Sequence, residues 1–131
     1  YYGLANYYAN NGKDVKPDVI SLQKADAAFE RVLVASPAYH EAYLYRARTN
    51  RLLEKDDVMT KNYEDYVAKV TALGAEETAK PAVKAKIIES YNNIAANYAN
   101  TDKAKAMDYF RKTLALDPAN AYATESLKTL K

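Results

Sequence analysis

One pattern occurs twice in this chain, in residues 25–37 (ADAAFERVLVASP) and in residues 106–118 (AMDYFRKTLALDP). Each copy places Phe four residues after Ala, and Pro eight residues after that Phe. Residues four apart lie on one face of an α-helix, and Pro cannot continue a helix beyond its first turn. The repetition therefore predicts two equivalent helices, each closed by a proline turn.

A second pattern precedes each copy of the first. It is found in residues 1–8 (YYGLANYY) and in residues 91–98 (YNNIAANY), and both read Tyr-x2-(Leu or Ile)-Ala-x2-Tyr. In this order the aromatic, small, Tyr, Ala, Phe and Pro positions resemble the tetratricopeptide repeat, a helix–turn–helix unit of 34 residues. The resemblance implies an all-α fold in which helical hairpins stack into a superhelix, because no single hairpin can bury its apolar face alone.

The composition also favours helices. Of 131 residues 49% are hydrophobic, whereas Gly (3) and Pro (4) are scarce. Apolar spacing and capping residues predict about seven antiparallel helices. The expected ranges are 1–10, 18–35, 38–54, 56–73, 77–99, 102–116 and 119–130.

These helices form a single predicted domain, residues 1–131, built from repeat-like units. The expected units are residues 1–37, a degenerate unit at 38–80, a third at 81–118 and a C-terminal capping helix at 119–131. The degenerate unit has Arg46 where the family pattern has Leu, and Asn50 where it has Tyr. Because the apolar helical pattern begins at Tyr1 without a capping signal, we expect the chain to be the C-terminal part of a longer one.

Close approach of neighbouring helices requires small side chains. The two patterns place Ala at such positions, and the residues expected to allow this contact are Ala5, Ala25, Ala47, Ala95 and Ala106.

Several classes of function are disfavoured by the sequence. A net charge of +2 with interspersed charges argues against nucleic-acid binding, and no apolar run reaches the 18 residues of a membrane-spanning helix. Cys is absent, His40 is the single His, and the sequence shows neither a zinc-ligand motif nor a serine with a base partner. There is no Gly-rich phosphate-binding loop. We expect a non-enzymatic protein with no cofactor and no metal.

The family resemblance implies a concave groove lined by the first helix of each unit. Carried over to this sequence, it predicts a peptide-binding groove formed by Tyr2, Asn6, Asn10, Leu44, Tyr45, Arg48, Arg51, Asn92 and Asn93. Asn amides can bond an extended peptide backbone, and Arg can bond a carboxylate through two parallel hydrogen bonds. The predicted function is therefore a protein–protein interaction scaffold that binds a partner peptide or helix.

Three alternatives remain open. Arg46, Arg48 and Arg51 could form a solvated face that pairs with neighbours such as Glu54. The segment could be the structural end of a longer repeat array. Tyr and Asn side chains also suit sugars, so a glycan-binding accessory of an exported protein is a further hypothesis. The compartment is unknown, although a Tyr- and Asn-rich, Cys-free composition is similar to that of exported bacterial proteins, periplasmic or at the cell surface.

Overall fold

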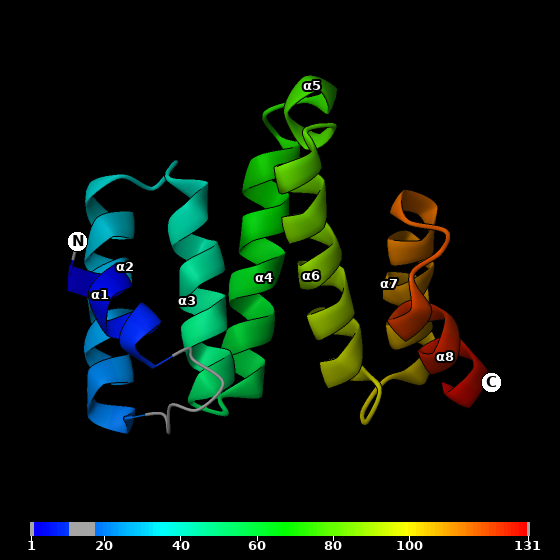
Figure 1. Cartoon of the computed structure of the whole chain (residues 1–131), viewed down its shortest axis with the longest axis horizontal. Coiled ribbons are helices and arrows are strands. Elements are labelled where there is room, and N and C mark those ends of the chain that lie inside the picture. Colours follow the sequence, from blue (N-terminus) through cyan, green and yellow to red (C-terminus); the bar gives the residue numbers. More distant parts are fainter. Residues whose placement is uncertain (1, 11–17, 131) are drawn as a thin grey trace. The chain divides into compact units, whose positions relative to one another are not determined.

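A computed structural model describes residues 2–10 and 18–130, excluding the side chain of Tyr2. All regular structure in these ranges is helical, as the sequence predicts, and Figure 1 shows the order of the helices. They are α1 (Tyr2–Ala9), α2 (Val19–Ala35), α3 (His40–Leu52), α4 (Asp56–Thr71), α5 (Ala75–Thr78), α6 (Pro81–Tyr98), α7 (Lys103–Leu116) and α8 (Ala121–Leu130).

The described residues thus form eight helices where about seven were expected. The difference is the single-turn helix α5, because the predicted helix at 77–99 is divided in two. Gly74 precedes α5 with φ +104°, a backbone conformation that L side chains rarely adopt, and Pro81 occupies the first turn of α6. Gly74 follows the end of α4, where its backbone N–H donates to the carbonyl oxygen of Thr71 at 3.1 Å, and it is also the N-terminal cap position of α5.

Two helix starts are fixed by aspartates, at the residues where the sequence predicts helices to begin. Asp18 accepts a hydrogen bond from the backbone N–H of Ile20 at the start of α2. Asp102 accepts one from the backbone N–H of Lys105 at the start of α7. Each carboxylate satisfies a donor that the first turn of a helix leaves unpaired.

The two copies of the repeated pattern fold into the same turn. Ser36 after α2 has φ −140° and ψ 77°, and Asp117 after α7 has φ −141° and ψ 85°. The carbonyl oxygen of each accepts a hydrogen bond of 3.0 Å from the backbone N–H three residues later. Equivalent sequence at residues 25–37 and 106–118 therefore gives equivalent local structure, as predicted.

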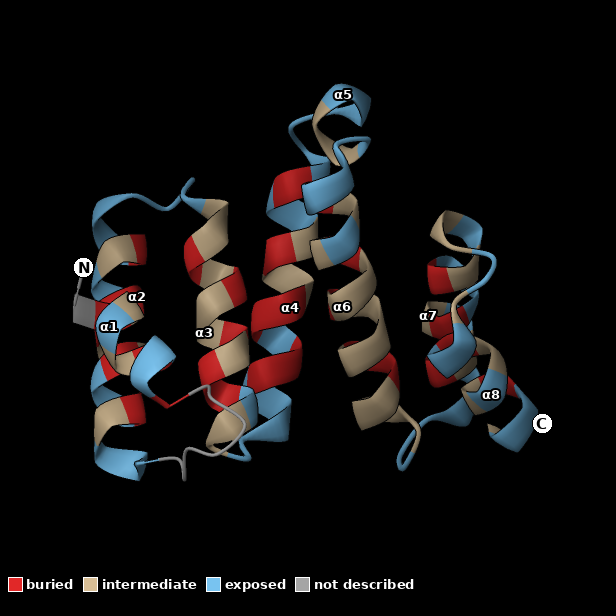
Figure 2. Ribbon diagram, in the orientation of Figure 1, coloured by how far each residue is buried: buried red, intermediate tan, exposed pale blue. Residues whose placement is uncertain are grey.

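By its internal contacts the chain forms two compact units, residues 1–69 and 70–131, and each is described by itself. In the first unit α2 packs against both α1 and α3. In the second α7 packs against both α6 and α8. Buried positions recur along these helices, as Figure 2 shows. The finer division into repeat units at 37, 80 and 118 stays a prediction.

The predicted small contact residues are fully buried with one exception. Ala25, Ala47, Ala95 and Ala106 have no exposed surface. Ala5 is exposed, so its assignment was wrong. The buried face of α1 is offered by Gly3 and Tyr7 instead, and Tyr7 joins a core cluster with Ala25 and Phe29. Phe29 and Phe110, the aromatic positions of the repeated pattern, are both buried.

Arg46 and Asn50, which depart from the family pattern, belong to one polar network in the structure. Arg46 donates through Nε to Asp26 Oδ1 at 2.8 Å, which places an ion pair between α3 and α2. Buried Asn50 directs Nδ2 to the same Asp26 oxygen (2.9 Å) and to Asn62 Oδ1 (3.2 Å). Side chains that depart from the family pattern thus satisfy one another in a polar network.

Candidate partner-binding surface

The candidate surface of the first unit lies along α3 and α1. Tyr45 of α3 is half-buried, and its ring stacks on Phe29 with centroids 5.7 Å apart and planes 14° apart. Its edge contacts the ring of Tyr7 at 5.6 Å. The Tyr45 hydroxyl forms a hydrogen bond of 3.0 Å with the hydroxyl of Tyr8. The ring of Tyr45 is therefore fixed in orientation by contacts to two other helices.

That hydrogen bond also affects ionisation. The contact with the Tyr8 hydroxyl, together with desolvation, raises the pKa of Tyr45 to about 12. The Tyr45 hydroxyl therefore keeps its proton to a higher pH than an unperturbed tyrosine, whose pKa is about 10.

Of the three arginines that follow Tyr45 on α3, Arg48 and Arg51 belong to the candidate surface. The guanidinium of Arg48 lies over the Tyr45 ring, 5.5 Å from its centroid, in cation–π geometry. Arg51, one turn further along, is exposed. Tyr45, Arg48 and Arg51 follow one another at three-residue spacing on α3, and we call these three residues the α3 edge.

Arg46 does not belong to this edge. It pairs with Asp26 and, at 3.6 Å, with Glu30, and both acids lie on α2. The alternative in which Arg46, Arg48 and Arg51 share one solvated face is therefore wrong for Arg46, because its guanidinium is held across the helix interface.

Two residues predicted for the groove lie inside the fold. Leu44 is completely buried, so it can present no surface to a partner. Asn10 is also buried, where its Oδ1 accepts from the backbone N–H of Asp18 (2.6 Å) and its Nδ2 donates to the carbonyl oxygen of Asn6 (2.8 Å). These amide groups fix the end of α1, and we remove both residues from the surface. Asn6 is half-buried, and the side chain of Tyr2 lies outside the described residues.

The predicted amides of the second unit take part in internal hydrogen bonds. Asn92 Oδ1 accepts from the Thr113 hydroxyl of α7 at 2.8 Å. Asn93 Nδ2 donates to the carbonyl oxygen of Glu89 at 2.8 Å. Both side chains remain half-exposed. Because α3 and α6 belong to different units, Asn92 and Asn93 are not part of the α3 edge.

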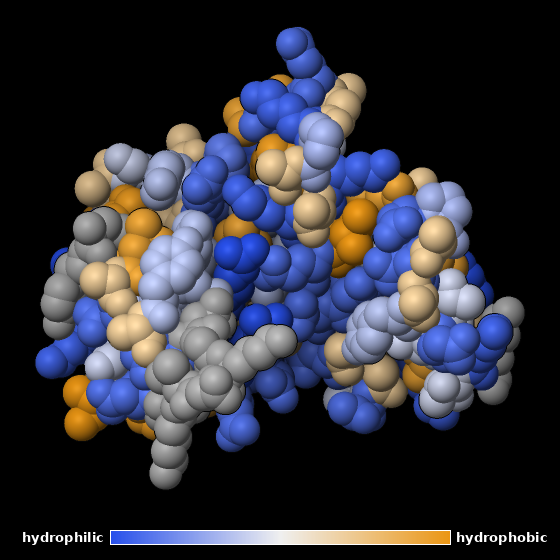
Figure 3. All heavy atoms as spheres, viewed as in Figure 1, coloured by the Kyte–Doolittle hydropathy of each residue, from blue (hydrophilic) through white to orange (hydrophobic). Residues whose placement is uncertain are grey.

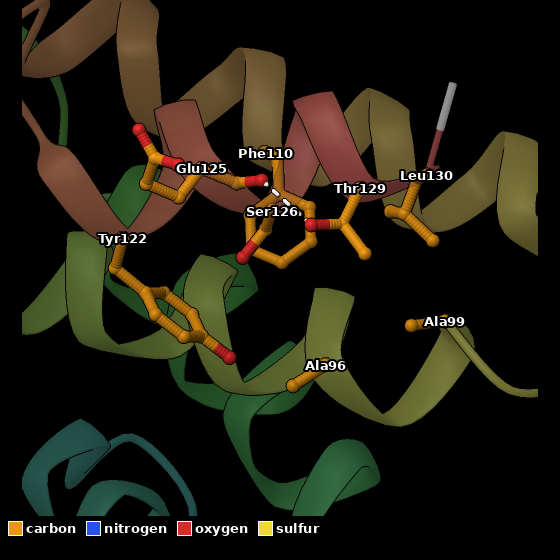
Figure 4. A pocket seen from close by; sticks show the side chains of 8 residues that line it. All are labelled: Ala96, Ala99, Phe110, Tyr122, Glu125, Ser126, Thr129 and Leu130. Atoms are coloured by element: carbon orange, nitrogen blue, oxygen red, sulfur yellow. Dashed lines mark hydrogen bonds between the residues drawn. The ribbon is translucent and has the colours of Figure 1, made fainter.

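A pocket that the sequence reading missed lies in the second unit. It has a volume of about 360 Å³, and Figure 4 shows residues of α8 on one side and of α6 on the other. The lining residues are Ala96, Ala99, Phe110, Tyr122, Glu125, Ser126, Thr129 and Leu130. Its sequence signal lay in the repeated pattern, which pairs Tyr45 with Ser126 when the copies are aligned.

A second pocket of similar volume, about 360 Å³, lies beside α5 in the same unit. It is lined by Thr71, Ala75, Thr78, Ala79, Lys84, Ile87, Tyr91 and Leu116. Burial raises the pKa of Tyr91 there.

Within the described residues no three His, Cys, Asp or Glu side chains gather as metal ligands would. None of the helices described is both long and apolar enough to cross a bilayer. On the face drawn in Figure 3, hydrophobic side chains form separate spots among hydrophilic ones.

Comparison with solved structures identifies the fold. A scan against protein-family models finds no match, and a search of the curated proteins finds none either. A crystal structure of the C-terminal part of a TPR repeat-containing protein from Cytophaga hutchinsonii matches with a TM-score of 0.74 and 32% identity over 95% of this chain. The chain is a tetratricopeptide-like helical repeat protein.

The tetratricopeptide-like chain spans 44% of the length of that matching chain. Its fold is typical of scaffolds for protein interaction rather than of enzymes, which agrees with the predicted class of function.

Proposed function

We propose that this tetratricopeptide-like domain is a non-enzymatic scaffold that binds a segment of a partner protein at the α3 edge. One observation carries the proposal: Tyr45 is held by Phe29, Tyr7 and Tyr8, and Arg48 lies over its ring. Tyr and Arg are the residue types enriched among those that dominate binding energy at protein interfaces. A ring already fixed in place loses little conformational entropy when a partner binds.

The chemistry of the α3 edge indicates what the partner segment offers. Arg48 and Arg51 are one helical turn apart, so both can reach one short acidic segment. Glu41, one turn before Tyr45, carries the opposite charge. A segment with a carboxylate over the arginines, and without one near Glu41, therefore fits this edge best.

The test is affinity capture from extract of the source cells, read by mass spectrometry. The bait domains are wild type, Arg48→Glu/Arg51→Glu, and a control, Arg31→Glu/Arg111→Glu. The control makes the same charge change at exposed arginines of α2 and α7. Circular dichroism verifies that each variant is folded.

We expect a partner that is captured by wild type and control and is lost with Arg48→Glu/Arg51→Glu. Equal capture by all three folded proteins would contradict the assignment to the α3 edge. Capture by none of them would favour the hypothesis that this segment is the structural end of a longer array.

A further inference from the structure

The pocket beside α5, which we call the α5 pocket, has two hydrogen-bond donors of α6 in its wall. Lys84 and Tyr91 both line it, and so does Ile87 between them. The three residues follow one another at spacings of three and four. Residues at these spacings share one face of a helix, so Lys84 and Tyr91 stand on the same side of α6.

The polar groups of Lys84 and Tyr91 are free to bond a ligand. Within residues 2–10 and 18–130, the Lys84 ammonium forms no ion pair or hydrogen bond, and the Tyr91 hydroxyl forms no hydrogen bond. Both side chains are partly buried. In the same ranges every fully buried side-chain N or O atom has a hydrogen-bond partner. The unpartnered ammonium and hydroxyl therefore remain accessible from outside the protein.

The charge around the α5 pocket is positive. Lys84 is the one charged residue among those that line it, and the acids of α5, Glu76 and Glu77, do not. A second ammonium, that of Lys112, lies 5.9 Å from the centroid of the Tyr91 ring. It forms no ion pair within the described part of the chain. An ammonium donates hydrogen bonds and cannot accept them, so this environment favours an anionic acceptor and repels a cation.

The other walls of the α5 pocket suit hydrocarbon. Ala75 and Ala79 of α5 line it with exposed methyl groups, and Leu116 at the end of α7 lines it while partly buried. The volume of about 360 Å³ lies at the lower end of the range for small-ligand sites. A ligand with a single carboxylate on a short apolar body matches both the charge and the walls.

We propose that the α5 pocket binds an apolar monocarboxylate. The carboxylate accepts hydrogen bonds from the Lys84 ammonium and the Tyr91 hydroxyl, and the hydrocarbon lies against Ala79 and Leu116. This site goes beyond the scaffold function, because it needs no partner protein. It also lies in a different unit of the chain from the α3 edge.

The probe is hexanoate, titrated at pH 7 into the ¹⁵N-labelled 131-residue chain while amide shifts are followed by NMR. We expect saturable shifts at Ala79, Lys84 and Tyr91, with a dissociation constant on the order of millimolar for a ligand of this size. Hexanamide has the same shape without the charge and should bind at least about fivefold more weakly. Hexylammonium, of opposite charge, should give no saturable shifts.

Three substitutions test the two donors. Lys84→Met keeps the length of the side chain, removes the ammonium and should weaken hexanoate binding by at least about fivefold. Tyr91→Phe keeps the ring, removes the hydroxyl and should weaken binding by about two- to fivefold. The control, Lys103→Met, removes an exposed charge of the same unit outside the pocket and should leave the affinity unchanged.

Absence of saturable shifts with hexanoate would overturn the proposal. Hexanamide or hexylammonium that binds as tightly as hexanoate would also overturn it, and neither comparison depends on the folding of a variant. Undiminished binding by folded Lys84→Met would contradict the assignment of the ammonium.

A last ligand distinguishes two sources of the carboxylate. N-acetylleucine carries it as the C-terminus of a peptide does, so tighter binding than hexanoate would assign the site to a chain terminus. Weaker binding would assign it to a free acid, and both results support an apolar carboxylate. Arg48→Glu/Arg51→Glu should leave hexanoate binding unchanged, so failure of the α3 edge and failure of the α5 pocket are distinguishable.

Discussion

The α2–α3 pair and the α7–α8 pair share a turn and a buried Ala–Phe framework, yet differ in the side chains that join their helices. In the first pair Asp26 and Arg46 form an ion pair. The residues 81 positions later are Met107 and Leu127, which lie in one apolar cluster. The same backbone geometry is thus held by charges in one place and by apolar packing in the other.

A second difference concerns the position of Tyr45. Its ring covers Phe29, whereas its counterpart Ser126 leaves a pocket beside Phe110. The framework positions therefore specify the turn and the helix contact. The positions between them differ between the two pairs, and they determine which side chains each pair exposes.

The largest effect is expected at the shared framework. Phe29→Ala and Phe110→Ala each remove a buried ring and should cost about 3–5 kcal/mol of unfolding free energy. Phe29→Ala should cost more, because it also removes the stacking partner of Tyr45. Urea unfolding measures both, and a Phe110→Ala loss below about 1 kcal/mol would argue against the equivalence.

A smaller effect is expected where the two pairs differ in charge. Asp26→Ala leaves Arg46 and Asn50 without a shared acceptor and should cost about 1–3 kcal/mol. Asp26→Met/Arg46→Leu replaces the ion pair with the residues found at the equivalent positions of α7 and α8. Its free energy of unfolding should lie within about 1 kcal/mol of the wild-type value.

Thermal unfolding of Asp26→Ala and of Asp26→Met/Arg46→Leu measures whether apolar packing can replace the ion pair. A double variant less stable than Asp26→Ala would show that the ion pair cannot be exchanged for apolar packing.

Tyr45→Ser gives α3 the residue that α8 carries at the equivalent position, Ser126. It should open a space beside Phe29 and cost about 1–3 kcal/mol, since the ring is only half-buried. Tyr45→Phe keeps the ring and loses the bond to Tyr8, so about 0.5–1.5 kcal/mol is expected. Chemical denaturation ranks them, and equal losses for Ser and Phe would mean that stacking on Phe29 contributes little.

The smallest effect is a dependence on alkaline pH. Because the folded-state pKa of Tyr45 is raised to about 12, ionisation is less favourable in the folded than in the unfolded chain. The stability from this group is complete below the unfolded value of about 10 and is lost as the pH rises through 12.

Tyr45→Phe serves as the reference, since other Tyr and Lys side chains titrate in the same range. The stability difference between wild type and Tyr45→Phe should shrink from pH 9 to pH 12. A constant difference would show that the Tyr8–Tyr45 hydrogen bond does not govern this pKa.

The helices and their ends could be predicted because local signals fix them. Asp18, Asp102 and the two proline turns act on neighbouring backbone, and their residue types are typical of caps and helix ends. The break between α5 and α6 was missed because Ala and Glu at residues 75–77 favour a helix and Pro81 is tolerated in a first helical turn. The prediction of which face of α1 is buried was also wrong, because helical spacing alone cannot show which side of the helix contacts α2.

The surface could be predicted only in part. Arg48 and Arg51 were found through the family pattern, but Leu44 and Asn10 turned out to be buried. The polar network around Arg46 required contacts between residues 20 and 24 positions apart. The pocket lined by Phe110, Tyr122 and Ser126 is formed by residues of three helices, so no single segment of the sequence predicts it.

The most direct test of the account is the affinity of the captured partner for purified domain variants, measured by isothermal titration calorimetry. We predict that Arg48→Glu/Arg51→Glu raises the dissociation constant by at least about tenfold, whereas Arg31→Glu/Arg111→Glu changes it by less than about twofold. The same dissociation constant for both folded variants would contradict the claim that the α3 edge binds the partner.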